Sequence, residues 1–335
     1  MKYMAGMIVR QSEVCLNNRF KKMDCRRCGQ ICPQGCMDAM QQPELTQCDE
    51  CGLCLAACPA QALAGVSYSP QSFEALLALE DAVLCLTCTQ QDKQSNWPCL
   101  GFLDARLLLT LVYSGKHSNR QIIVDNRGCA DCKPAVARHL QQLCDTVAPV
   151  LAFAGKKPLL HGPAAAGYQR REKAISRRAL ASWLWGEAKS VIAVAVTSSE
   201  EPLPLPRRKL LANYVGALAG MEEPTRLFSG LVIAGNCHAC GLCRQICPEQ
   251  AIVTKDRGNT VDFYHQALAC TGCGVCAVHC PRGAITLGPA AGLTLSHIAS
   301  RTLPECQDCG KVYQPVGDNA LCLVCSLKNN GNIFG

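Results

Sequence analysis

The chain has 335 residues, a formal net charge of +7 and 27 cysteines. So high a cysteine content is typical of short secreted disulfide scaffolds, and this chain is far too long to be one. Because aromatic residues make up only 5% of the chain, we expect folding units built around metals rather than around large apolar cores.

The sequence contains neither an evident export signal nor a membrane span. The apolar patch at residues 4–9 is too short for the apolar region of a secretory signal. A run of about 18 apolar residues, as a membrane-spanning helix requires, is also absent. We therefore expect a cytoplasmic protein in a reducing compartment, where thiols stay available as ligands.

The most specific pattern lies towards the C-terminus, where two cysteine runs have the spacing C-x2-C-x2-C-x3-C-P. They begin at Cys237 and Cys270 and end at Cys247 and Cys280, each followed by proline. In such pairs three thiolates of one run hold one cubane, and the fourth ligates the other cluster. Zinc knuckles are the alternative, but zinc sites do not need two paired runs. The expected sites are Cys237, Cys240, Cys243 with Cys280, and Cys270, Cys273, Cys276 with Cys247.

These two runs resemble those of bacterial-type two-cluster ferredoxins. The resemblance implies a ferredoxin-like module over residues 233–292 that holds two [4Fe-4S] clusters.

The N-terminal third contains a second, altered pair of runs. Residues 48–58 form a complete run, whereas residues 25–32 lack the first cysteine of the pattern. We expect Cys15 to replace it, because a ligand on a longer loop costs little extra closure entropy. Cys36, just past the altered run, is the rival ligand. This predicts a second two-cluster module over residues 1–75. Its sites are Cys15, Cys25, Cys28 with Cys58, and Cys48, Cys51, Cys54 with Cys32.

The middle of the chain has a different pattern of secondary structure. Apolar runs predict strands at residues 82–86 and 121–125 and helices at residues 103–113 and 134–143. This alternation indicates a small α/β domain over residues 80–150. All but one of its cysteines come at or just beyond a predicted strand end, where parallel sheets place their sites.

The cysteine order of this domain resembles the iron–sulfur delta subunit of methanogen hydrogenases, although its last two cysteines are closer together. The resemblance covers roughly residues 82–147. It implies a [2Fe-2S] domain that passes electrons to a heterodisulfide reductase. A zinc site and a ligand-free domain are the alternatives. We expect Cys88 to be a spare thiol and Cys144 a buried structural thiol. The expected ligands are Cys85, Cys99, Cys129 and Cys132.

The tail, residues 300–330, contains two C-x2-C pairs, the first followed by glycine. This arrangement is typical of a zinc ribbon, in which four thiolates fold a segment that has little core of its own. A rubredoxin-type iron site is the alternative, but it usually has a longer spacer. The expected metal ligands are Cys306, Cys309, Cys322 and Cys325.

Residues 151–232 contain no cysteine and concentrate the positive charge. Between residues 156 and 209 there are 11 Lys and Arg against 4 Asp and Glu. We expect a basic connector with helices, which is either a solvated spacer or a docking patch for an acidic partner. Nucleic acid is not an expected partner, because no helix-turn-helix or base-stacking motif accompanies the charge.

Motifs for catalysis are absent from the sequence. It has no C-x3-C-x2-C run for radical chemistry, no dinucleotide-binding glycine pattern and no phosphate-binding loop. Catalytic residues are therefore not assigned, and we expect a non-catalytic subunit of an oxidoreductase complex. Reduction of a small substrate at the middle site is a further option, but no sequence feature defines that substrate.

Together these patterns predict an α+β multidomain chain: two ferredoxin-like modules flanking a small α/β domain and a basic connector, plus a zinc ribbon. The chain resembles polyferredoxin-type electron-transfer proteins. We expect four [4Fe-4S] clusters, a [2Fe-2S] cluster and zinc. The predicted function is to relay electrons to or from a larger catalytic subunit of an anaerobic complex: a hydrogenase, a molybdenum or tungsten enzyme, or a disulfide reductase. The alternative is an iron–sulfur redox sensor or assembly factor.

Overall fold

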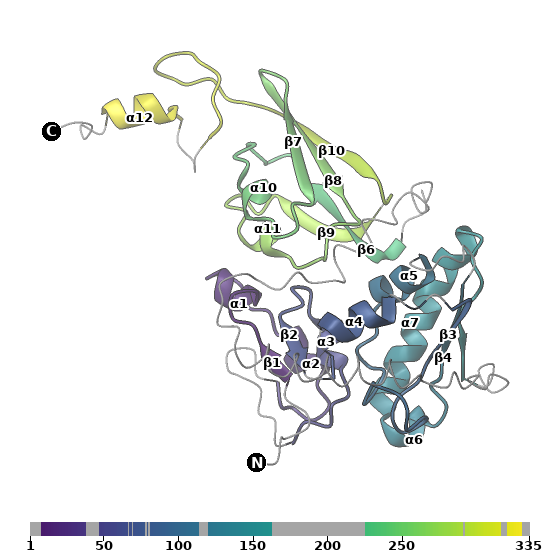
Figure 1. Ribbon diagram of the computed structural model, residues 1–335. Helices are drawn as coiled ribbons and strands as arrows, with labels where there is room; N and C mark the ends of the chain where they lie inside the picture. Colours follow the sequence, from purple (N-terminus) through teal and green to yellow (C-terminus); the bar gives the residue numbers. More distant parts are fainter. Residues whose placement is uncertain are drawn as a thin grey trace. The chain divides into compact units, whose positions relative to one another are not determined.

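The chain divides into two compact units, formed mainly by residues up to 214 and from 215 onward. Among the helices that the structure describes, none combines the length and the apolar character that crossing a bilayer requires. Residues 163–224, most of the predicted basic connector, lie outside the described residues. The computed structural model (Figure 1) describes residues 8–37, 47–65, 67–68, 70–77, 79, 81–113, 120–162, 225–290, 292–315 and 320–329.

The N-terminal module is built from one strand pair and short helices. Strands β1 (Ile8–Arg10) and β2 (Leu63–Gly65) pair antiparallel, with Val9 opposite Ala64. The pair brings the two ends of the module together, so that segments far apart in sequence can share a metal site. The helices are α1 (Leu16–Arg19), α2 (Arg27–Ile31), α3 (Leu53–Ala57) and α4 (Pro70–Leu77).

The middle domain is a parallel sheet with helices, as the sequence predicts. The strands lie in the order β3 (Val83–Leu86), β4 (Gln121–Val124) and β5 (Leu160–His161). The predicted strand positions of β3 and β4 are confirmed. Because β5 pairs with β4, this sheet continues past the predicted domain end at residue 150.

Three helices connect these strands, and α7 runs alongside β3 and β4 (Figure 1). Helix α5 is buried over nearly its whole length, with Leu107 to Val112 all inaccessible. Cys144 is buried in α7, as expected. Helix α7 begins with proline, whose fixed φ suits a first turn, and it is longer than predicted. The helices are α5 (Ala105–Tyr113), α6 (Cys129–Cys132) and α7 (Pro134–Phe153).

The C-terminal unit contains two antiparallel sheets. In one, β6 (Thr225–Ile233) pairs with β9 (Ile285–Ala290). In the other, the order is β10 (Leu295–Thr302), β8 (Thr260–Gln266) and β7 (Ile252–Asp256). The paired strands of this unit thus begin before residue 233 and end after residue 292, the bounds predicted for the module.

The core of this unit lies around Phe263, which is fully buried on β8. The short helices α10 (Leu242–Ile246) and α11 (Val275–Val278) each carry part of a cysteine run. Helix α12 (Leu323–Asn329) belongs to the cysteine-containing tail.

Candidate metal centres

The three complete cysteine runs share one backbone turn. In each, a glycine with positive φ follows the second cysteine and directly precedes the helix that carries the third. Glycine adopts this conformation at little steric cost. In the altered run, Arg26 stands at this position with φ −113°, so the loop before it follows a different path. The glycines are Gly52 (φ 79°), Gly241 (φ 75°) and Gly274 (φ 84°).

A second turn follows each Cys-Pro pair. The third residue after the cysteine has positive φ in all four runs: Gly35, Gln61, Gln250 and Gly283. In the three complete runs the next residue is an alanine, and its N–H donates to the cysteine sulfur. Such bonds favour the thiolate form, which is the form that binds metal. The N–H···S pairs are Ala62 to Cys58, Ala251 to Cys247 and Ala284 to Cys280, each 3.3 Å.

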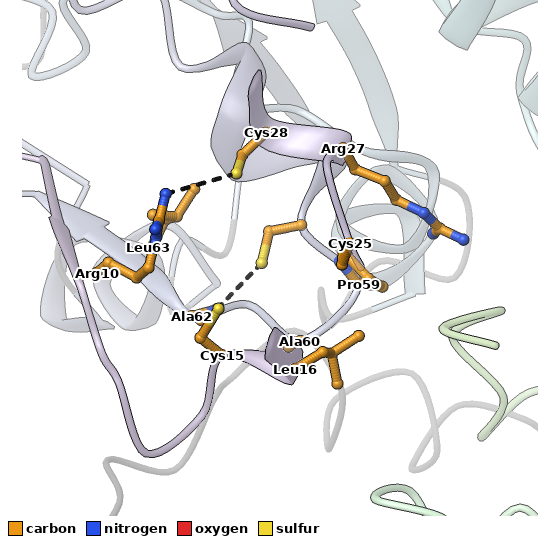
Figure 2. A pocket seen from close by; sticks show the side chains of 11 residues that line it. Arg10, Cys15, Leu16, Cys25, Arg27, Cys28, Pro59, Ala60, Ala62 and Leu63 are labelled. Atoms are coloured by element: carbon orange, nitrogen blue, oxygen red, sulfur yellow. Dashed lines mark hydrogen bonds between the residues drawn. The ribbon is translucent and has the colours of Figure 1, made fainter. Parts of the chain in front are cut away.

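Site 1 is the group formed by Cys15, Cys25, Cys28 and Cys58. These four thiols line one cavity together with the buried Arg10 (Figure 2). The guanidinium Nη2 of Arg10 lies 3.9 Å from the sulfur of Cys28. Burial raises the pKa of Cys28, and the Arg10 charge opposes that rise. Arg10 thus places positive charge where thiolates of a metal site would gather.

Cys15 reaches site 1 through a specific backbone clamp. The side-chain amide of Asn17 donates to Cys25 O at 2.9 Å and accepts from Cys25 N–H at 2.7 Å. Because Asn17 lies in α1, two residues after Cys15, these two hydrogen bonds tie the remote cysteine to the altered run. The structure therefore brings the expected replacement ligand to the cavity.

Site 2 consists of Cys32, Cys48, Cys51 and Cys54. Burial raises the pKa of Cys54, and the other three thiols, together with Cys28 of site 1, raise it further. Cys36 lies here rather than in the site 1 cavity: its sulfur is 3.4 Å from the sulfur of Cys32. Burial, with the neighbouring Cys32 and Cys48, raises the pKa of Cys36 to about 12.

The C-terminal module contains two further groups, which take ligands crosswise from the two runs. Burial raises the pKa of Cys243 to about 12, and nearby Cys237, Cys240 and Cys280 raise it too. We call this group site 3. The other four thiols line one cavity and form site 4: Cys247, Cys270, Cys273 and Cys276.

Site 4 also contains two unpartnered polar atoms. His265 Nε2 and Thr271 Oγ1 are buried without a hydrogen-bond partner, and both residues line the cavity. Burial lowers the pKa of His265 to about 4, so its ring is neutral at pH 7. Buried polar atoms are nearly always satisfied. Sulfide atoms of a bound cluster would supply the acceptors, and the residues present fit such a cluster.

The middle thiol group includes a thiol that the sequence-based prediction leaves spare. Burial raises the pKa of Cys129 to about 12, and Cys88, Cys99 and Cys132 raise it further. Cys88, which the prediction leaves spare, is therefore near the other three. Cys85, the predicted ligand, lies inside β3 opposite Ile123. Strand β3 ends at Leu86, so that Cys88 is the first cysteine on the loop after it. The middle thiol group thus comprises Cys88, Cys99, Cys129 and Cys132.

The tail group consists of Cys306, Cys309, Cys322 and Cys325, whose sulfur atoms all lie within 4.8 Å of one another. The N–H of Cys322 donates to the sulfur of Cys306 at 3.3 Å. This bond and others from backbone N–H groups lower the pKa of Cys306 to about 6. Four converging thiols are the ligand set of tetrahedral structural zinc sites, and rubredoxin-type iron uses the same set.

Comparison with known proteins agrees with this geometry. Residues 236–285 match the family described as 4Fe-4S dicluster domain, and this range includes all thiols of sites 3 and 4. A stretch of 43 residues, 13% of the chain, is 37% identical to pyruvate synthase subunit PorD of Methanothermobacter marburgensis. The match covers 53% of that protein, so the chain spans about half the length of this relative. The chain thus contains a 4Fe-4S dicluster ferredoxin domain, and these findings support an iron–sulfur protein that transfers electrons.

Proposed function

We propose that this chain is the electron-relay subunit of an oxidoreductase complex. In this proposal sites 1 to 4 hold [4Fe-4S] clusters, the middle thiol group holds a [2Fe-2S] cluster, and the tail group holds zinc. Iron–sulfur clusters, when bound, accept and release single electrons. The observation that carries the proposal is that thiols distant in sequence converge into groups of four.

The helices within each module support a continuous relay. Helix α2 contains Cys28 of site 1 and is followed directly by Cys32 of site 2. In the same way, α10 contains Cys243 of site 3 and is followed by Cys247 of site 4. About one helical turn therefore separates a ligand of one site from a ligand of the neighbouring site. We infer that the two centres of a module exchange electrons directly.

The partner is proposed from the chain's own chemistry and from its relative. The thiol groups described here are suited to bind metal centres, whereas the sequence provides no motif for substrate or nucleotide binding. The name of the relative states that it is a subunit of pyruvate synthase. We therefore expect a larger catalytic oxidoreductase subunit as partner, of the hydrogenase, molybdenum or tungsten enzyme, disulfide reductase or 2-oxoacid class.

Metal analysis of protein purified without oxygen tests the cluster content. We expect about 16 to 18 irons and about one zinc per chain. Fewer than about ten irons after full reconstitution would contradict four cubanes. Affinity purification under the same conditions, with mass spectrometry, tests the partner. A co-purifying large oxidoreductase subunit supports the relay, and a free chain with affinity for DNA or a client protein supports a redox sensor or assembly factor.

A further inference from the structure

The loop of the middle domain that contains Cys99 packs directly on the site 2 loop of the N-terminal module. A Cβ atom added at Gly101 would lie 2.2 Å from the carbonyl oxygen of Cys51. A Cβ atom added at Gly52 would lie 2.8 Å from the backbone nitrogen of Phe102. Each loop therefore needs a glycine where the other approaches, and the backbones on which Cys51 and Cys99 lie are in contact.

The Tyr68 hydroxyl forms hydrogen bonds to both of these loops. This buried hydroxyl donates to Glu50 O at 2.7 Å and is shared with Cys99 O at 3.2 Å. These carbonyls belong to the residue before Cys51 and to Cys99 itself. The ring of Tyr68 packs against both Trp97 and Phe102, with centroid distances of 6.1 and 5.2 Å. The hydroxyl is thus fixed in place, and it fixes the spacing of the two thiol-bearing loops.

Lys133 connects the middle thiol group with the site 2 loop. Lys133 follows Cys132 directly, and its Nζ donates to the backbone carbonyl of Asp49 in the site 2 loop and lies 3.5 Å from the Asp49 carboxylate. The Lys133 side chain is only 22% exposed, so solvent screens its charge incompletely.

We propose that site 2 and the middle thiol group form one electron-transfer pair, in which Lys133 is the cation that tunes both redox centres and Tyr68 is the residue that positions them. This inference rests on the proposed function, because it requires an iron–sulfur centre in each group. A nearby positive charge stabilises the reduced, more negative state of each centre. Transfer within the pair moves one electron and breaks no bond. Electrons would then pass between the N-terminal module and the middle domain through the loops of Cys51 and Cys99.

Redox titration of the full chain without oxygen, followed by EPR, tests this proposal. Lys133→Gln should lower the midpoint potentials of both centres, whereas Lys133→Arg, which keeps the charge, should leave them near the wild-type values. Asp49→Asn, which removes a negative charge at the same place, should raise the potential of site 2. Lys157→Gln, at an exposed lysine of the same unit, is the matched control and should shift neither centre.

The outcomes separate the two proposals. Iron content equal to that of the wild type shows that a variant has folded and loaded its centres. A wild-type chain without a [2Fe-2S] signal contradicts the proposed cluster in the middle group, and the pair with it. If the wild type shows both signals but Lys133→Gln does not lower both midpoint potentials, the proposed pair is wrong. The cluster assignment would then still stand. Mutual broadening of the two signals in the fully reduced wild type is the independent result that we expect of adjacent centres.

Discussion

The sulfur of Cys36 lies 3.4 Å from the sulfur of Cys32, at the chain position where the three complete runs have an alanine. In those runs the alanine N–H donates to the sulfur of the Cys-Pro pair. The altered run thus keeps the turn, with Gly35 at positive φ, and adds a side-chain thiol next to site 2. Cys36 is therefore placed away from the cavity where Cys15 lies.

This placement predicts different outcomes for two cysteine substitutions. Cys15→Ser should lose or convert one cubane, because serine replaces a thiolate that lines the site 1 cavity. Cys36→Ala should keep the iron content and EPR spectrum of the wild type, because alanine is the residue that the other three runs have at this position. Iron analysis and EPR of the two variants measure this. Loss of a cubane in Cys36→Ala together with an unchanged Cys15→Ser would reverse our assignment.

The sequence predicts those parts of the cysteine sites that depend on residues close together in the chain. Each complete run folds by turns whose glycines and prolines lie within the run, so its spacing alone indicates which thiols can meet. The contact between Lys133 and Asp49 joins residues 84 positions apart, and no local pattern predicts it. Strand β5 has only two residues, too few to show a period. The predicted strand and β3 both end at Leu86, so the choice between Cys85 and Cys88 depends instead on which thiol lies near Cys99 and Cys129, and no local pattern shows that.

We expect the unpartnered polar atoms of site 4 to raise the midpoint potential of the centre bound there. His265→Leu should lower the midpoint potential of the site 4 centre, because a hydrogen bond to a cluster sulfur stabilises the reduced state. Thr271→Val should act in the same direction. His297→Leu, at a half-exposed histidine on β10, is the matched control. A potential that neither substitution changes, at full iron content, would mean that these atoms bind something other than the cluster.

The middle thiol group predicts an order of importance among its cysteines. Cys88→Ser should abolish or alter the [2Fe-2S] signal, because Cys88 lies with Cys99 and Cys129. Cys85→Ser should leave the signal in place, since Cys85 lies within β3. EPR of the reduced full chain compares the two variants. The reverse result would restore the ligand set that the sequence alone predicts.

We expect the stability of the middle domain to depend on the hydrogen bonds of Arg120. It is 1% exposed and donates to the carbonyl oxygens of Asp81 at 3.0 Å, Leu111 at 3.3 Å and Leu79. Arg120→Met should lower the free energy of unfolding by about 2 to 4 kcal/mol, because it removes three hydrogen bonds made by a buried guanidinium and leaves the buried carbonyl of Leu111 without this donor. Urea unfolding followed by tryptophan fluorescence measures the loss. Arg138→Met, on the exposed side of α7, should change it by less than about 0.5 kcal/mol, and equal losses in both would contradict the role of Arg120.

The tail predicts a link between its metal and site 3. Gln314, between the two cysteine pairs of the tail, donates from Nε2 to Ala239 O at 3.0 Å, and Ala239 is fully buried between Cys237 and Cys240. If zinc folds the tail, removing it should release this contact and shift the EPR signal of site 3 but not that of site 4. Cys309→Ser should lose the zinc, keep the iron and produce this selective shift, and Gln314→Ala should reproduce the shift with zinc still bound. Metal analysis and EPR on the same samples measure both effects. Loss of zinc with no change at site 3, or equal changes at both sites, would show that the tail folds without influence on the ferredoxin module.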